Sequence, residues 1–159
     1  MVRLENDSDP SFASGYVVAK TQGGVILQSN HGSRGVRIKP DTLVWKEFNQ
    51  GADIIQLQDW LDVKGVPLQD GTLEARSEWV WVNIGRREGV VQQVSPQGVA
   101  IRHDKGVETF ELSKHLEVIN ARDESPRAGG VTSLLPGMRV GAVGLRLPNS
   151  GFRATRIWT

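Results

Sequence analysis

Apolar residues recur along the chain in short runs that alternate with polar residues, and turn-forming residues separate the runs. A period of two is typical of half-buried β-strands, and no stretch of a dozen residues has the 3.6-residue period of a helix. The pattern predicts an all-β fold with at most a turn or two of helix, near TSLLPG. In the first half, strands are expected at GYVVAK (15–20), VILQ (25–28), VRIK (36–39), LVWKEF (43–48), WLDVKGVPL (60–68) and TLEARSEWVWV (72–82).

Two segments of the first half match two segments of the second half, in the same order and without gaps. SGYVVAKTQGGVILQ (14–28) overlays EGVVQQVSPQGVAIR (88–102) with an offset of 74. WLDVKGVPLQDGTLEARSEW (60–79) overlays RVGAVGLRLPNSGFRATRIW (139–158) with an offset of 79. Matches of this kind indicate a tandem duplication. The extra residues of the second copy are expected in a polar, Gly- and Pro-rich insertion near 121–131.

Each copy has the size of a small antiparallel barrel, in which closure of the sheet removes its edges. The sequence therefore predicts two tandem OB-like β-barrels of about six strands each. The expected organisation is an N-terminal tail (1–12), a first barrel (13–82), a short rigid junction (83–87) and a second barrel (88–159).

Several motifs carry a resemblance to a known family. GGV in the second strand, LLPGMRVGAVG, and the closing strands DGTLEA and SGFRATRI resemble small bacterial β-barrel domains that are catalogued as a domain of unknown function. These domains often occur in tandem in secreted or envelope-associated proteins, so the resemblance implies the barrel fold and an extracytoplasmic setting, and it transfers no catalytic residue. The first copy departs from the pattern where Gln58 and Asp59 replace the Pro-Gly turn.

Charge and composition narrow the classes of function. Nineteen basic and eighteen acidic side chains give a net charge of +1, so no overall field attracts nucleic acid or an anionic membrane. After Glu124 the chain has five arginines and no acid, which indicates either an ordinary solvated surface or an anion-binding face. The absence of cysteine excludes disulfides and thiolate zinc sites.

The ends and the hydropathy of the chain bear on its location. No segment has 18 consecutive apolar residues, so no transmembrane helix is expected. Residues 1–12 lack the apolar region of a secretory signal, which fits either a cytoplasmic protein or one whose leader has been removed.

Residues that carry catalysis do not form a recognisable pattern. His31, His103 and His115 have no metal-ligand spacing, and Ser33 follows His31 without a nucleophile-elbow motif. Covalent catalysis needs a nucleophile held by a base, which adjacency in sequence does not supply. The sequence predicts a protein that is not an enzyme, with no catalytic residue, no metal and no cofactor.

Two groups of residues are candidates for a binding surface. Trp45 with Lys46 beside it suits a small stacking platform, although large aromatic side chains mostly pack in cores. In the second copy, strand alternation places Arg139 and Arg153 outward, and on neighbouring strands they would share one face that Arg146 extends.

The stretch EWVWVNIG (78–85) is interpreted as the joint between the barrels. The overlay matches Trp79 to Trp158, which predicts that Trp79 is the last inward residue of the first barrel. Beyond it the alternation fails, and a strand that is apolar on both faces is covered on both. Val80, Trp81 and Val82 are therefore expected to lie between the barrels.

These features favour a non-catalytic structural or protein-interaction module made of duplicated barrels, associated with the cell envelope or self-assembling. A protein partner or a second copy is the expected partner, with VRLENDS (2–8) as a candidate donor strand. The alternative is binding of single-stranded nucleic acid or an oligosaccharide on one OB-like barrel face.

Overall fold

A computed structural model describes residues 9–159 of the chain. Backbone contacts divide it into two compact units, with the boundary between Ile84 and Gly85. This boundary falls within the expected junction 83–87. Of the expected tail, residues 1–8 lie outside the described residues, and Phe12 already belongs to the first strand.

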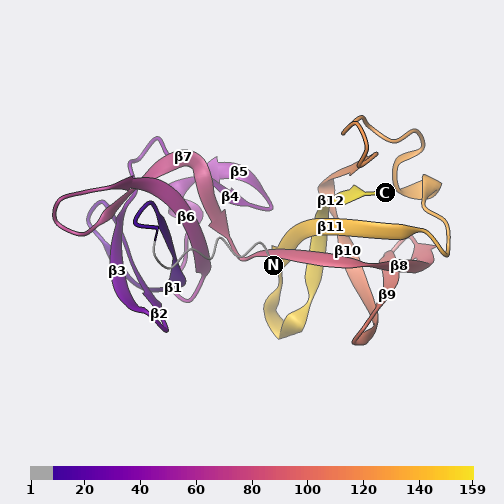
Figure 1. Ribbon diagram of the computed structural model, residues 1–159, viewed down its shortest axis with the longest axis horizontal. Helices are drawn as coiled ribbons and strands as arrows, with labels where there is room; N and C mark the ends of the chain where they lie inside the picture. The colour runs from indigo at the N-terminus through magenta and orange to yellow at the C-terminus, as the bar shows by residue number, and fades with distance from the viewer. Residues whose placement is uncertain (1–8) are drawn as a thin grey trace. The chain divides into compact units, whose positions relative to one another are not determined.

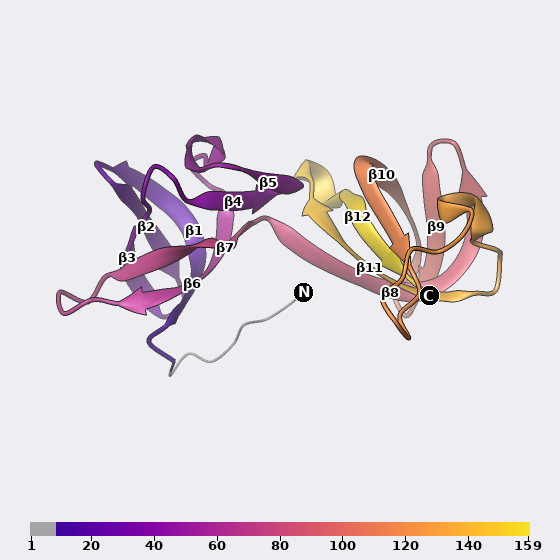
Figure 2. The same ribbon diagram turned by 90° about the horizontal axis from the view of Figure 1, so that it is seen from above.

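The first unit is a closed barrel that carries an additional hairpin (Figure 1). Its strand order is β3-β2-β1-β6-β7, and a parallel pairing of β3 with β7 closes it. The hairpin of β4 and β5 continues the sheet beside β7 (Figure 2). The strands are β1 (Phe12–Thr21), β2 (Gly24–Ser29), β3 (Gly32–Arg37), β4 (Leu43–Lys46), β5 (Phe48–Gly51), β6 (Trp60–Pro67) and β7 (Leu73–Val82), with a 3₁₀ turn η1 (Ala52–Ile54).

The second unit is a closed barrel of five strands in the order β10-β12-β11-β8-β9. Here the parallel pairing of β10 with β12 corresponds to that of β3 with β7. The strands are β8 (Ile84–Ser95), β9 (Gly98–His103), β10 (Gly106–Ile119), β11 (Arg139–Arg146) and β12 (Phe152–Trp158), with 3₁₀ turns η2 (Gly130–Ser133) and η3 (Pro148–Ser150).

The expected all-β fold of two tandem small barrels is confirmed, with differences in detail. Each barrel closes with five strands, and the first unit has seven strands because LVWKEF forms two. These two strands meet at Glu47, whose φ of 75° turns the chain. The sheets are antiparallel except for the closing pair and the pairing of β4 with β7, which are parallel.

The two barrels have equivalent strand registers as well as the same strand order. The β1–β2 ladder shifts between Val17 and Ala19, and the β8–β9 ladder shifts between Val91 and Gln93, 74 residues later. The parallel pairs Trp45 with Trp81 and Ile119 with Trp158 also correspond, so β4 is equivalent to the end of β10. The offset becomes 79 only after this point, which places the five extra residues of the second copy in the segment 121–130.

Glycines stand where neighbouring strands of a barrel approach most closely. A Cβ on Gly24 would lie less than 3.0 Å from the carbonyl oxygen of Val36, and a Cβ on Gly98 would meet that of Phe110 in the same way. Real Cβ atoms do not come this close to backbone, so only glycine fits. The same close approach recurs at two further equivalent pairs, Gly15 with Gly89 and Gly65 with Gly144.

Replacing Gly24 by Ala should destabilise the first barrel by about 1–3 kcal/mol, because the backbones of β2 and β3 must separate. Hydrogen exchange should show faster opening of the first-barrel amides and little change in the second barrel. Gly51→Ala is the matched control, because its Cβ would meet mainly the carboxylate end of the Asp53 side chain. Equal effects of the two substitutions would contradict the close-approach explanation.

The turn before β6 keeps its geometry although the Pro-Gly sequence is missing. Gln58 has a φ of 73°, and Gly137 has a φ of 93° at the equivalent place. The backbone N–H of Gln58 donates to the oxygen of Val17, as that of Gly137 donates to the oxygen of Val91. The barrel therefore imposes a left-handed conformation that glycine adopts freely and glutamine does not.

Gln58→Gly should stabilise the first barrel by about 0.5–1 kcal/mol, because relief of left-handed strain exceeds the entropy cost of glycine. Denaturant unfolding followed per barrel by tryptophan fluorescence and hydrogen exchange would measure the change. The reciprocal Gly137→Gln should destabilise the second barrel by a similar amount. If Gln58→Gly were destabilising, the left-handed turn would not be a source of strain.

Candidate binding face of the first barrel

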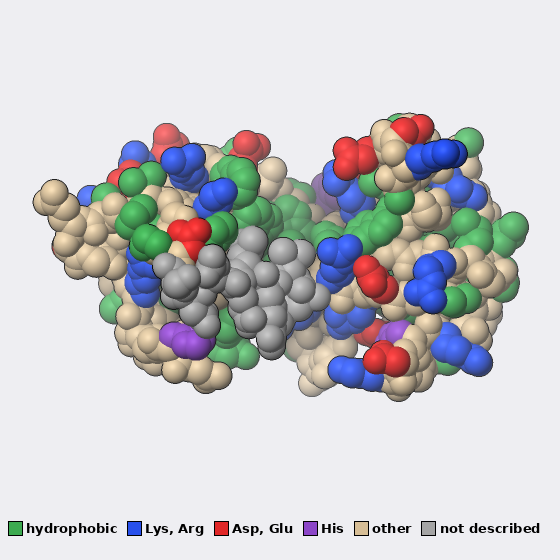
Figure 3. Space-filling view, in the orientation of Figure 1, with side chains coloured by type: hydrophobic (Ala, Val, Ile, Leu, Met, Phe, Trp, Pro, Cys, Tyr) green, Lys and Arg blue, Asp and Glu red, His purple; other side chains and the backbone are tan. Residues whose placement is uncertain are grey.

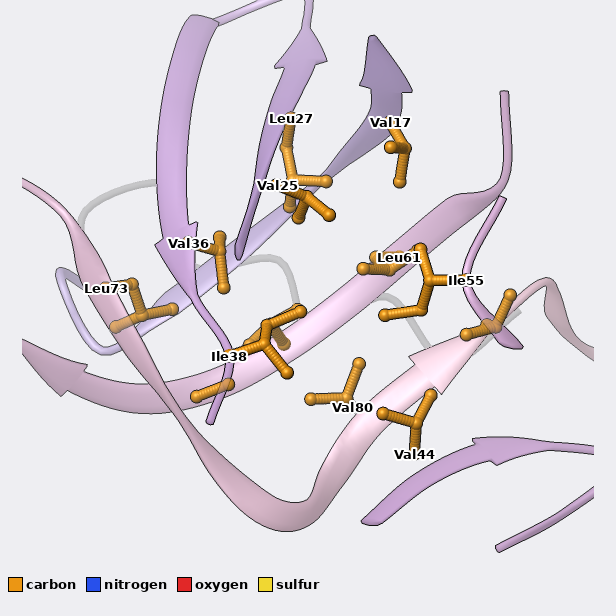
Figure 4. Packing of buried hydrophobic residues seen from close by; sticks show 13 residues of the cluster. Val17, Val25, Leu27, Val36, Ile38, Val44, Ile55, Leu61, Leu73 and Val80 are labelled. Atoms are coloured by element: carbon orange, nitrogen blue, oxygen red, sulfur yellow. The ribbon is translucent and has the colours of Figure 1, made fainter. Parts of the chain in front are cut away.

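A bulge in β7 determines which residues around Trp79 face the core. Val63 pairs with Val80, and Gly65 pairs with Ala75, so residues 76–79 of β7 lie opposite Lys64 alone. Within the bulge Glu78 has a φ of 69°. A bulge with an extra residue reverses the facing of the strand beyond it. Val80 and Val82 are consequently fully buried in the first core, where Val80 points toward the other core side chains (Figure 4).

The sequence interpretation of EWVWVNIG is therefore corrected. Trp79 is 42% exposed and does not face the core. Val80 and Val82 belong to the core of the first barrel, so the alternation fails because of the bulge and not because the strand is covered on both faces. Trp81, between them, points outward and is half-buried.

The overlay also slips by two residues within this strand. Trp81 pairs with Asp62 of β6, and Trp158 pairs with the equivalent Gly141 of β11. Trp158 is therefore the counterpart of Trp81, not of Trp79. The bulge makes β7 two residues longer than β12 between equivalent positions, and an ungapped alignment cannot represent this.

Strands β1, β6, β7 and β4 are consecutive in the sheet, and their outward residues form one face. Tyr16 pairs with Trp60, and Trp81 pairs with Trp45. Inward neighbours such as Leu61 are fully buried, which fixes the opposite orientation of these side chains. We call this surface the aromatic face; it comprises Phe12, Tyr16, Trp45, Trp60, Trp79 and Trp81, with Ser14, Asp62 and Lys64 among them.

Two edge-to-face ring pairs organise the aromatic face. The ring centroids of Tyr16 and Trp60 are 4.8 Å apart with an interplanar angle of 82°, and those of Trp79 and Trp81 are 5.6 Å apart at 76°. The ammonium of Lys64 lies 4.6 Å from the ring centre of Trp79. Edge-to-face packing stabilises such pairs, so the rings are held in fixed orientations.

A carboxylate lies among these rings. Asp62 is only 6% exposed although it is on the outward side of β6. Its Oδ1 accepts hydrogen bonds from the hydroxyl of Ser14 (2.6 Å) and the indole N–H of Trp60 (3.4 Å). The carboxylate therefore orients an indole and places a negative charge next to the aromatic rings.

The second barrel provides an internal comparison for this face. The positions of Tyr16, Trp45 and Trp60 are taken there by Val90, Ile119 and Arg139. Both barrels close in the same way, so aromatic residues at these positions are not required by the fold. At the place of Asp62 the second barrel has Gly141, and the Trp158 indole lies so close that a Cβ there would overlap it.

The two predicted binding residues of the first copy, Trp45 and Lys46, do not belong to the same surface. Trp45 is on the aromatic face, half-buried beside Trp81. Lys46 instead pairs with Asp59, with 3.1 Å between Nζ and Oδ2 and side-chain exposures of 18% and 10%. Asp59 also accepts from the backbone N–H of Gln56 (2.9 Å) and the side-chain amide of Asn83 (3.0 Å). Lys46 therefore takes part in a structural network and not in a stacking platform.

Asp59→Ala should destabilise the first barrel by about 3–5 kcal/mol, because it leaves Lys46 poorly solvated and two donors unpaired. Chemical denaturation would measure the loss. The surface pair of Lys39 and Glu74, with side-chain exposures of 61% and 24%, provides the control, and Glu74→Gln should change stability little. Similar small effects for both variants would contradict a structural role for Asp59.

The predicted arginine surface of the second barrel is not a single patch. β11 and β12 are neighbours as expected, but Arg153 lies opposite Leu145, which is ~20 Å along the strand from Arg139. Arg153 pairs with Glu111 at 3.0 Å. Arg146 is half-buried, and its Nε makes no hydrogen bond within the described part of the chain. Blue and red side chains alternate over the visible side of this barrel (Figure 3).

The histidines of the described residues do not form a metal centre. Across residues 9–159, no three His, Asp or Glu side chains come together as metal ligands. His103 is near Glu108, with 3.3 Å between Nε2 and Oε1, and Arg87 also contacts Glu108 at 2.9 Å. His31 lies in an exposed turn.

The barrel face that binds oligonucleotides in OB folds lacks stacking residues here. That face is formed by the second and third strands. β2, β3 and β9 contain no Phe, Tyr or Trp, and the Phe110 of β10 is 1% exposed. Residues 9–84 carry seven Lys or Arg and nine Asp or Glu, so the first barrel also lacks the positive charge that single strands require.

No protein-family model matches the chain, and no curated protein matches it in sequence. Over residues 9–159, no helix has the length and apolar character needed to cross a membrane.

Sequence reasoning missed Tyr16, Trp60 and Trp79 as members of a surface. A signal was available in the overlay, because Tyr16 is matched to Val90 and Trp60 to Arg139. Where only one copy has an aromatic residue, the barrel fold that both copies share does not require it. Such a residue is therefore a candidate for binding.

Proposed function

We propose that the protein is a non-catalytic protein-interaction module and that its first barrel binds a polypeptide partner through the aromatic face. The observation that carries the proposal is the gathering of six of the ten aromatic residues of the chain on one outer face of a single barrel. Tryptophan and tyrosine dominate the binding energy of protein interfaces.

Exposure and rigidity support this proposal. Tyr16 is 49% exposed and Trp79 is 42% exposed, so both contribute apolar area that a partner can bury. Each is held by a perpendicular ring neighbour, which lowers the entropy lost on binding. The second barrel, with the same fold and a mostly non-aromatic counterpart face, is proposed to have a structural role.

An oligosaccharide is the second candidate ligand for the same face. The rings and the hydroxyl of Ser14 suit a neutral polar chain, and the small net negative charge of the first barrel does not oppose one. We also retain as proposals the relationship to tandem bacterial barrel domains and the extracytoplasmic setting that it implies.

Selection of displayed random peptides on the full chain would test polypeptide binding. Enriched peptides should bind with dissociation constants that rise at least about tenfold in Tyr16→Ala and Trp79→Ala, because these truncations remove interface aromatics. The matched control is Arg139→Ala with Arg153→Ala in the second barrel, which should leave binding unchanged.

Three outcomes would contradict the proposed partner class. In the first, the selection enriches no peptide. In the second, the enriched peptides still bind after both aromatic substitutions. In the third, the control substitutions in the second barrel weaken binding as much as the aromatic substitutions do. Trp79-dependent binding of a glycan from an array, with no peptide enriched, would replace a polypeptide by an oligosaccharide as the ligand.

A further inference from the structure

We infer that charges on the closing pair of strands match each closing hairpin to its own barrel and oppose an exchange of the two hairpins between the copies. The closing pair is β3 with β7 in the first barrel and β10 with β12 in the second. The closing hairpins are β6–β7 and β11–β12. This selection acts on the assembly of the barrels and is independent of what the aromatic face binds.

The backbone alone does not distinguish the two closing hairpins. Both barrels close in the same strand order, and Gly65 and Gly144 make equivalent close approaches in the two hairpins. Exchange of equivalent segments is a characteristic assembly error of repeated domains. Correct closure therefore needs an interaction that favours one hairpin and disfavours the other.

The charged residues of the closing pair are reversed between the copies. In the first barrel, Arg37 of β3 is in register with Glu74 of β7. In the second barrel, Glu111 of β10 is in register with Arg153 of β12. The offsets of 74 and 79 residues make Arg37 equivalent to Glu111 and Glu74 equivalent to Arg153. Base and acid have thus changed places at one pair of equivalent positions.

Each closing pair is held by opposite charges on its outer side. Glu74 binds Lys39, with 2.7 Å between Oε1 and Nζ, and Arg153 binds Glu111, with 3.0 Å between Nη2 and Oε2. The Nε of Arg153 donates a further hydrogen bond of 3.1 Å to the same carboxylate oxygen. The pKa of Glu74 lies below its ordinary value, mainly because of the hydrogen bond to Lys39, and the charge of Arg37 also lowers it.

Exchange of the hairpins would replace these attractions by repulsions. Glu74 would lie opposite Glu111 in one exchanged barrel. In the other, Arg153 would lie opposite Arg37, with Lys39 close by. Like charges that are directly opposite each other destabilise a pair of strands. The reversal therefore penalises both exchanged barrels at once.

Side-chain size on the inner side of the closing pair also differs between the copies. Val36 is in register with Leu73 in the first barrel, whereas the rings of Phe110 and Phe152 pack edge to face in the second. Exchange would bring a phenylalanine into a core that holds a leucine, and the reverse. Substitutions on the outer side leave this size difference unchanged, so the effect of the charges can be measured separately.

Two introduced thiols would report exchange, because the chain has no cysteine. Thr72 lies beside Gly35 in the first barrel, where a Cβ on Gly35 would be 3.1 Å from the Thr72 methyl group. The equivalent of Gly35 in the second barrel is Thr109. In an exchanged barrel, the thiols of Thr72→Cys and Thr109→Cys would be neighbours across the closing pair and within reach of a disulfide. The full chain would be refolded in glutathione buffer, and mass spectrometry would measure the disulfide-linked fraction.

Glu111→Arg with Arg153→Glu gives both closing pairs the same polarity, while each native pair stays attractive. Charge then no longer opposes exchange, so the disulfide-linked fraction should rise at least about fivefold above that of the chain with unchanged charges. The matched control adds Arg37→Glu, Lys39→Glu and Glu74→Arg, which makes the two polarities different again. The disulfide-linked fraction of this control should return to the starting level.

The three substitutions in the first barrel, made alone, provide a second chain of matched polarity in case the first does not fold. Added salt should also raise the disulfide-linked fraction of the chain with unchanged charges, because salt screens the repulsion between exposed side chains.

A folded chain of matched polarity with an unchanged disulfide-linked fraction would overturn the inference. An equal rise in the control with both pairs reversed would also overturn it, because the rise would then follow from the substitutions and not from the matching of polarity. A fraction that salt leaves unchanged would contradict a role of charge. None of these results would affect the proposed function, which peptide binding tests separately.

Discussion

The architecture depends on the distance at which strand backbones pass each other as a small sheet curls closed. In each barrel three glycines occupy places where any Cβ would enter a neighbouring carbonyl group, and the three places are equivalent in the two copies. Two of these glycines, Gly65 and Gly144, flank the register shifts in the last hairpin of each barrel. Close approach and register shift together bend the sheet enough for the third and last barrel strands to meet. The hydrophobic core of each barrel lies inside the closed sheet.

Much of the barrel architecture could be predicted from the sequence, because the glycines and the alternation of apolar and polar residues are visible in it. The overlay aligned Gly15 with Gly89 and Gly65 with Gly144, and these are the positions of close approach. What it could not represent was a change in strand length. The bulge at Glu78 adds residues without adding a turn signal, so simple alternation placed Trp79 inside and Val80 outside, the reverse of their positions. The direction of a side chain beyond a bulge depends on tertiary pairing, which period-two reasoning does not include.

The candidate site was harder to predict than the fold for a related reason. Tyr16, Trp60 and Trp81 are far apart in the sequence, and only the order β1-β6-β7 brings them to one face. The sequence identifies Trp45 as a candidate for this surface, but the neighbouring Lys46 forms an ion pair with Asp59. Strand alternation predicts that β11 and β12 are neighbours, but it does not predict their register. Register decides whether two outward residues lie side by side, and in the observed register Arg139 and Arg153 do not.

Duplication explains how one barrel can acquire a face that the other lacks. With Gly141 beneath it, the indole of Trp158 lies against the sheet, and Arg86 covers it. Asp62 in the equivalent position has a side chain that would occupy the space of such an indole, so Trp81 cannot lie down in the same way. It packs instead against the edge of Trp79, while Asp62 binds Ser14 and Trp60. The difference between Gly141 and Asp62 at this position thus explains why the two indoles pack differently and why only Trp81 has a carboxylate beneath it. The glycines at the close approaches, in contrast, are the same in the two copies, because a side chain at these positions would force the strands of the barrel apart.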